Sequence, residues 1–204
     1  MVFLCSGKNS IFTQDDIIPT KLDEIPQEWK DSLRQSEKAV QIENVNEITD
    51  EDFKCFKRSV LLPTPAKGLS EAIGINGKRT LLKRGVFAKN AIRHPDLSPE
   101  DSRTIIGNAL YSPDKYGRNR PITKPNYWVA IKNSTNSSIV VIEVSETKNY
   151  VEIVGWRYAN ERNLAQLEKQ AKREGGQFLI LFPEGDTAAG LSTLPFDLIL
   201  QKYN

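Results

Sequence analysis

The sequence predicts an α+β fold, in which N-terminal helices are followed by a small antiparallel sheet and preceded by an acidic extension. Helical patterns occupy the chain up to about residue 111, and β-rich runs begin at residue 127. Residues 1–56 carry 6 Lys and Arg against 12 Asp and Glu, whereas residues 57–204 carry 22 against 14. We therefore expect an acidic extension over residues 1–60 and a basic domain over residues 70–204.

The first predicted elements are short helices. A proline opens a helical pattern at residues 26–40, and Thr49 or Asp50 could cap a second helix that runs through Phe56. Prolines and a glycine then interrupt the pattern, which predicts a linker at about residues 60–70.

Two better-defined helices follow. The first covers residues 85–94 and ends there, because the residue before Pro95 avoids the α region. The second starts after Ser98, a good N-cap that forms a capping-box pattern with Asp101, and it ends near Tyr111.

The later part of the chain is predicted to form strands. Three β-rich runs cover residues 127–131, 138–144 and 150–156, and their short polar links predict an antiparallel meander. Alternation in the third run places Ile153, Gly155 and Arg157 on one face and Val154 and Trp156 on the other. A helix at 160–174 and strands at 178–182 and 194–200 complete the prediction.

The only histidine, His94, lies among basic residues. The run Lys78 to Arg93 holds six cations and no acid, and a second acid-free run, Lys115 to Lys132, holds five more. A side chain that titrates near neutrality among fixed positive charges suits the handling of a phosphodiester. The alternative is a histidine at the edge of the core, because His94 shares a helical face with Phe87 and Ala91.

The order of these motifs resembles a family of phage-associated nucleases. The stretches KNAIRHPDLSPED, IIGNALYSPD, YWVAIKN, SIVVIEVS and VEIVGWRY are similar to the barnase–EndoU–colicin–RelE class, found at the C-terminus of phage head-morphogenesis proteins. The similarity covers about residues 70–200 and leaves out the acidic extension.

This resemblance implies a metal-independent ribonuclease that needs no cofactor, with tRNA among the candidate RNAs and an immunity or inhibitor protein as a partner. His94 would act as base or acid, and Ser192 and Thr193 are the only candidates for a Ser/Thr frequent near the last strand of such proteins. Some relatives use two histidines, whereas this chain has one. A phage or mobile-element toxin or effector would fit this description.

Further candidate residues surround the histidine in sequence. Arg157 could clamp a phosphate through its planar guanidinium, or it could be a solvated arginine at the sheet edge. Glu143 could be a general base, but an outward-facing strand residue is the favoured interpretation. Candidates for nucleic-acid binding through charge or base stacking, each of which could instead belong to a solvated face or the core, are Lys83, Arg84, Lys89, Arg93, Lys124, Tyr127 and Tyr158.

Several classes of protein are excluded or left open by composition. The chain contains no apolar run of the roughly 20 residues that a membrane span needs, no CxxC and one histidine, so a membrane partner and a zinc centre are not expected. We expect a cytoplasmic or phage-delivered protein. Alternatives to a ribonuclease are a non-catalytic nucleic-acid-binding or phage assembly module on the same fold, and an enzyme that modifies tRNA or a nucleotide. The acidic extension could cover the basic surface and limit access of nucleic acid.

Overall fold

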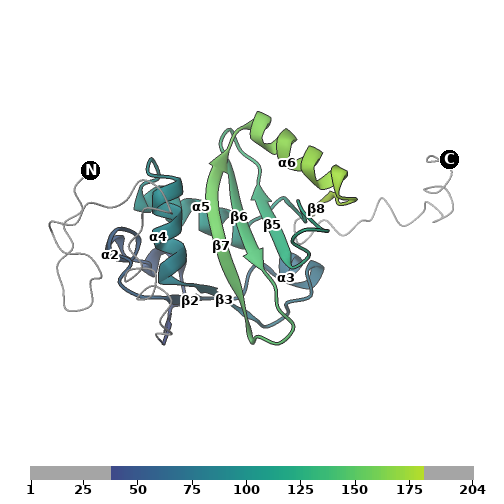
Figure 1. Ribbon diagram of the computed structural model, residues 1–204. Coiled ribbons are helices and arrows are strands. Elements are labelled where there is room, and N and C mark those ends of the chain that lie inside the picture. Colours follow the sequence, from purple (N-terminus) through teal and green to yellow (C-terminus); the bar gives the residue numbers. More distant parts are fainter. Residues whose placement is uncertain (1–37, 182–204) are drawn as a thin grey trace, which may run out of the picture.

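The structure is a computed structural model that describes residues 38–181. In this part of the chain, eight strands form one mixed sheet in the order β1-β2-β3-β7-β6-β5-β4-β8. Figure 1 shows the long central strands β7, β6 and β5 side by side. The strands are β1 (Val40–Gln41), β2 (Val60–Leu62), β3 (Arg79–Leu82), β4 (Lys115–Gly117), β5 (Tyr127–Lys132), β6 (Ser137–Glu143), β7 (Tyr150–Ala159) and β8 (Phe178–Ile180).

The fold is α+β, but the prediction of N-terminal helices followed by a small antiparallel sheet is wrong. Three strands precede the two central helices, β1 runs parallel to β2, and β3 runs parallel to β7. The missed strands β1 to β4 contain two to four residues each. Such short segments are too brief to show the two-residue alternation from which strands are predicted, and their partners are distant in sequence.

Five α-helices and one 3-10 helix surround the sheet within the described residues. They are η1 (Val45–Glu47), α2 (Asp50–Cys55), α3 (Lys67–Ala72), α4 (Arg84–Arg93), α5 (Pro99–Tyr111) and α6 (Glu161–Arg173). The capping box predicted at Ser98 is confirmed, because Ser98 Oγ accepts from Asp101 N at 3.0 Å and the Asp101 carboxylate accepts from Ser98 N at 3.2 Å. Thr49 caps α2 with a second capping box.

The predicted antiparallel meander is present as β5, β6 and β7. A β-bulge interrupts it, because Val141 lies opposite Gly155 while the next residue of β6 lies opposite Ile153, which leaves Val154 without a partner on β6. The predicted alternation is therefore wrong at Ile153, which is buried in the main core together with Trp156. Gly155 and Arg157 remain on the opposite face.

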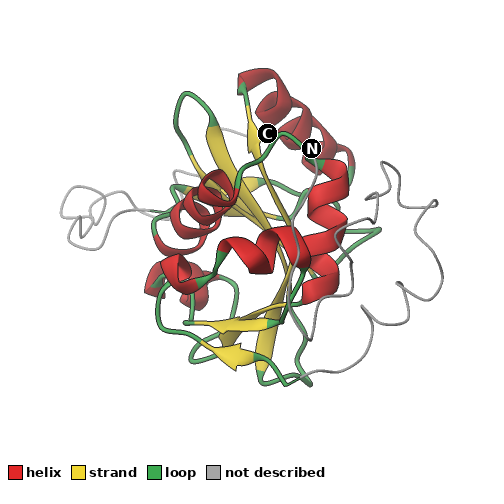
Figure 2. Ribbon diagram, turned by 90° about the vertical axis from the view of Figure 1, so that its left-hand side faces the viewer, coloured by secondary structure: helices red, strands yellow, loops and turns green. Residues whose placement is uncertain are grey.

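Helices cover both sides of the strands (Figure 2). Helix α5 packs against β5, β6 and β7 over the main hydrophobic core. Helix α6 lies over the other face, where Leu167 packs against a smaller cluster that includes Val129 and Ile139. Helix α4 packs beside β7 and α2. No helix in residues 38–181 is long and apolar enough to cross a membrane.

Residues 38–62 share the main core with the rest of the described chain. Strand β2 pairs with β3, and the Phe53 ring lies 5.1 Å from Phe87 and 6.1 Å from Trp156, measured between centroids. The stretch predicted as a linker at 60–70 holds β2 and the start of α3. The division into an acidic extension over 1–60 and a second domain over 70–204 remains a prediction.

Two predicted elements fall at the ends of the chain. Most of the predicted helix at 26–40 and the whole strand at 194–200 lie outside the described residues, and Val40 lies in β1. The strand predicted at 178–182 corresponds to β8.

Candidate functional site

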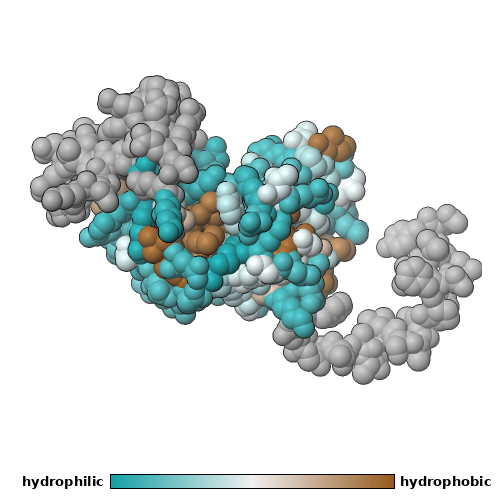
Figure 3. All heavy atoms as spheres, turned by 90° about the horizontal axis from the view of Figure 1, so that it is seen from below, coloured by the Kyte–Doolittle hydropathy of each residue, from teal (hydrophilic) through white to brown (hydrophobic). Residues whose placement is uncertain are grey.

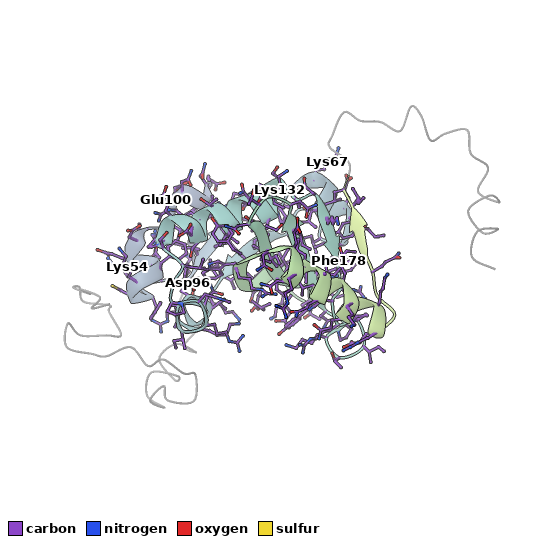
Figure 4. The ribbon with its side chains drawn as sticks, turned by 90° about the horizontal axis from the view of Figure 1, so that it is seen from above. Lys54, Lys67, Asp96, Glu100, Lys132 and Phe178 are labelled. Atoms are coloured by element: carbon purple, nitrogen blue, oxygen red, sulfur yellow. The ribbon has the colours of Figure 1, made fainter. Side chains whose placement is uncertain are left out.

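A cavity of about 550 Å³ opens on one face of the sheet, between α4 and the connection from β4 to β5. The residues that line it are Lys89, Asn90, Arg93, His94, Asn119, Arg120, Lys124, Tyr127, Ile139, Val141, Val154, Gly155, Trp156 and Arg157. Five of these residues are cations, and none is a carboxylate. Viewed from above, α4, next to Asp96, and α6, next to Phe178, stand on the same side of the sheet, while α5, near Glu100, lies on the other (Figure 4).

Helix α4 is attached to the edge of β7 by two side chains that line the cavity. Strand β3 pairs with only the first residues of β7, and α4 runs beside the remainder. Asn90 Oδ1 accepts a hydrogen bond from Trp156 N at 3.2 Å, and Lys89 Nζ donates to the carbonyl oxygen of Val154. Buried backbone groups need such partners, so these contacts hold α4, which forms one wall of the cavity, against strand β7.

His94 is the C-cap of α4, and its backbone N–H donates to the Asn90 carbonyl at 2.9 Å. The side chain is half-buried and lines the cavity, so it is not enclosed in the hydrophobic core. Burial lowers the pKa of the imidazole below its ordinary value, Arg157 and Arg93 lower it further, and Asp96 opposes them. A lowered pKa favours the neutral imidazole at pH 7, which can accept a proton.

None of the five cations of the cavity forms an ion pair with a carboxylate of residues 38–181; they are Lys89, Arg93, Arg120, Lys124 and Arg157. Their charges act on one another, because burial, Arg93 and Lys124 all lower the pKa of Lys89, while Glu143 opposes them. A hollow lined by charges of one sign concentrates ions of the other sign. The cavity is therefore suited to an anionic ligand with several charges.

The connection from β4 to β5 is held in place by the end of α6. The Glu174 carboxylate accepts hydrogen bonds from the backbone N–H groups of Ile122 and Thr123, each at 3.0 Å. With its amide oxygen turned toward Arg120, Gln170 accepts from Arg120 Nε at 2.7 Å. These contacts support the segment that brings Arg120 and Lys124 to the cavity.

Tyr127 is the aromatic residue best placed for a ligand in the cavity. It is half-buried, and Lys124 Nζ lies 4.8 Å from the centroid of its ring. Trp156 also lines the cavity, but its side chain belongs to the main core and is only 3% exposed. The Tyr158 hydroxyl donates to Asp101 Oδ1 at 3.3 Å, and its ring packs against the main core.

The structure thus brings together six of the residues singled out from the sequence: His94, Arg157, Lys89, Arg93, Lys124 and Tyr127. It does not bring Lys83, Arg84 or Tyr158 to this cavity. Lys83 forms an ion pair with Glu152 at 2.8 Å, and Arg84 is buried. The candidates Ser192 and Thr193 lie outside the described residues.

Sequence reasoning missed three polar residues of the cavity: Asn90, Asn119 and Arg120. Arg120 belongs to the acid-free run that drew attention to Lys124, so its charge was a usable signal. Nothing in the local sequence distinguishes Asn90, because its role depends on the edge of a strand 66 residues later in the chain.

A second cavity of about 560 Å³ lies near Trp128, whose side chain packs toward the main core. Arg118 Cζ lies 4.3 Å from the centroid of the Trp128 ring, and Glu146 is part of the lining. This cavity contains one cation and one acid, so it lacks the uniform charge of the first.

Seen from below, the described surface is mostly hydrophilic, and its hydrophobic side chains form separate groups (Figure 3).

Comparison with known proteins gives one family. The sequence model of the family described as large polyvalent protein-associated domain 13 matches residues 34–171. This range contains every element from β1 to β7 and most of α6. No curated protein and no solved structure matches the chain.

Proposed function

The chain belongs to the large polyvalent protein-associated domain 13 family, and we propose that it is a metal-independent, ribonuclease-like domain that binds and cleaves RNA in the cationic cavity. The observation that carries this proposal is the meeting of His94 with Lys89, Arg93, Lys124 and Arg157 in one hollow without a carboxylate. The family name supports the expectation of a domain from a phage or mobile element.

Cleavage of RNA through its own 2′-hydroxyl needs a base, an acid and stabilisation of the charged phosphorane. His94, with its lowered pKa, is suited to remove the 2′-hydroxyl proton. Arg157 and Arg93 line the same cavity as His94 and lower its pKa, which supports a role for their guanidinium groups in stabilising the phosphorane. Within residues 38–181, no three His, Cys, Asp or Glu side chains gather in a way that could hold a metal ion.

The remaining cavity residues support binding of the strand. Lys124 and Arg120 add positive charge on the wall opposite α4. The half-buried ring of Tyr127 also lines the cavity and is a candidate for stacking a base, an interaction that contributes about 1–3 kcal/mol in other proteins. One candidate substrate is tRNA.

A second candidate function is a nucleic-acid-binding module without catalysis. The presence of a single histidine favours it, since some nucleases of the class that the sequence resembles use two. The cluster of cations would be sufficient for binding phosphates by itself.

The proposal is tested by incubating the full chain with total RNA in EDTA, next to His94→Ala and the control Lys169→Ala on the exposed side of α6. We expect cleavage by the original chain and by Lys169→Ala, products with 2′,3′-cyclic phosphate ends, and a loss of about 10²–10⁴-fold in rate for His94→Ala. Binding without cleavage by all three proteins would support the second function. Absence of binding would exclude both.

A toxin or effector role is tested separately. Expression of an RNA-cleaving chain should slow the growth of the host cell, and His94→Ala should relieve this effect. An inhibitor protein that protects cells should then compete with RNA for the cavity.

A further inference from the structure

We infer that Lys89 is the second proton-transfer residue of the site, whose ammonium group protonates the departing 5′-oxygen of the RNA. This inference rests on the proposed function. It names the second proton-transfer group that a site with a single histidine needs. One imidazole can remove the 2′-hydroxyl proton, but the leaving oxygen still needs a proton from another group.

The other groups in the cavity are less suited to this role. Arginine side chains do not lose their proton in proteins, which removes Arg93, Arg120 and Arg157. Burial, together with Glu143 and Glu152, raises the pKa of Tyr127 and makes its hydroxyl a weaker acid. Lys124 is exposed to solvent and lies over the Tyr127 ring.

Lys89 has the fixed position that an acid needs. It is half-buried between α4 and β7, and one of its N–H groups is bound to the carbonyl of Val154, the bulged residue of β7. An ammonium group has three donors, so two remain for a substrate in the cavity. A bulge beside a candidate site commonly serves to aim a group in this way.

The charges around Lys89 come from three elements. Arg93 lies one turn further along α4, Lys124 comes from the connection between β4 and β5, and Glu143 comes from β6. Burial and the two cations lower the pKa of Lys89 despite Glu143. A lysine with a lowered pKa releases its proton more readily than a solvated lysine does.

Lys89 and His94 line the same cavity from two points of one wall. Lys89 comes from the body of α4, and His94 is the C-cap of that helix. The attacking and leaving oxygens of phosphoryl transfer lie in line on opposite sides of phosphorus, so an acid and a base must face each other across it. Arg93 lies between them in the chain and acts on the pKa of both.

The resulting step is balanced. The neutral imidazole of His94 takes the 2′-hydroxyl proton while the O2′–P bond forms, and the P–O5′ bond breaks as Lys89 transfers a proton to O5′. The products are a 2′,3′-cyclic phosphate, a 5′-hydroxyl, imidazolium and a neutral amine. Exchange of protons with water restores both side chains.

The test compares two RNA oligonucleotides, one with a normal 5′-oxygen at the scissile bond and one with a bridging 5′-sulfur. Sulfur leaves as a thiolate and needs no acid. We expect Lys89→Arg, which keeps the charge and can still donate to Val154, to lose about 10²–10⁴-fold on the oxygen substrate and to approach the original rate on the sulfur substrate. His94→Ala should be impaired on both, and the control Lys169→Arg on neither.

Other outcomes distinguish failure of the inference about Lys89 from failure of the proposed function. Full activity of Lys89→Arg and Lys89→Gln on the oxygen substrate would overturn the inference and leave the proposed function intact. An equal loss on both substrates, in a variant whose circular dichroism spectrum is unchanged, would assign Lys89 to phosphate binding instead. If the original chain cleaves neither substrate, the proposed function itself fails.

Discussion

The two faces of β6 and β7 are built from alternate residues of the same two strands, yet one face is buried core and the other lines a cavity. Val140 and Ile142 are fully buried, on the face that α5 covers. Val141, Gly155 and Arg157 line the cationic cavity on the other face. Because a strand directs successive side chains to opposite sides, one segment supplies hydrocarbon to the core and also lines the cavity in which we propose that RNA binds. Substitutions on the two faces should therefore have separable effects.

The largest effect is expected on the covered face. Ile142→Ala removes a fully buried side chain and should lower the free energy of unfolding by about 2–5 kcal/mol. Val141→Ala, at the adjacent half-buried position, is the matched control and should cost much less. Chemical denaturation measures both. Equal losses would mean that the cavity face is as tightly packed as the core.

Arg157→Ala, on the cavity face, is expected to weaken RNA binding and to leave the stability of the fold nearly unchanged. Loss of a charged hydrogen-bond donor to phosphate should weaken RNA binding by about 1.5–3 kcal/mol, or roughly 10- to 150-fold. Stability should change by less than about 0.5 kcal/mol, because the side chain is half-buried and lies outside the core. Fluorescence anisotropy with a labelled RNA gives the affinity, and unchanged affinity would remove Arg157 from the binding surface.

The pH dependence distinguishes catalysis from binding on the cavity face. The pKa of His94 lies below the ordinary 6.5, so most of the imidazole is still neutral when the pH falls to about 6.5. Below its own pKa the imidazole becomes protonated, and cleavage should slow by about tenfold per pH unit, equivalent to about 1.4 kcal/mol. RNA binding should become tighter over the same range because a positive charge is added. A cleavage rate that rises with acidity would contradict the role of His94 as base.

A smaller effect is expected at the start of α5, the helix that covers the core face. Ser98→Ala removes the side-chain cap and should cost about 1 kcal/mol of stability. Affinity for RNA should be unchanged, because Ser98 does not line the cavity. The combination of thermal unfolding and anisotropy checks both parts, and a loss of affinity would show that α5 and the cavity are coupled.

Local sequence signals predicted the central part of the fold. The Ser98 capping box, the proline after His94 and the β-rich runs of the meander correspond to α5, the end of α4 and strands β5 to β7. Each of these signals acts within a few residues, so it is visible without knowledge of the fold. The short strands β1 to β4 were missed because their stability comes from partners far away in the chain.

The candidate site shows the same division. Clustered charge around the only histidine pointed to His94, Arg93 and Lys89, which lie on α4 or at its C-cap and therefore stay together in space. Arg84 belongs to the same basic run but is buried, and Tyr158 is bound to Asp101. Charge in a sequence does not reveal which way a side chain turns, so these two could not be separated from the rest.

By itself, the sequence determined the amphipathic helices, the alternating strands and the excess of positive charge after residue 56, because these depend on residue type and short-range periodicity. Only the tertiary structure decided that α4 lies against the free edge of β7 and that a bulge reverses the face of Ile153. It also decided that Lys124 and Arg157 meet His94 across a single hollow. Such meetings depend on packing between segments distant in sequence, and no local pattern encodes them.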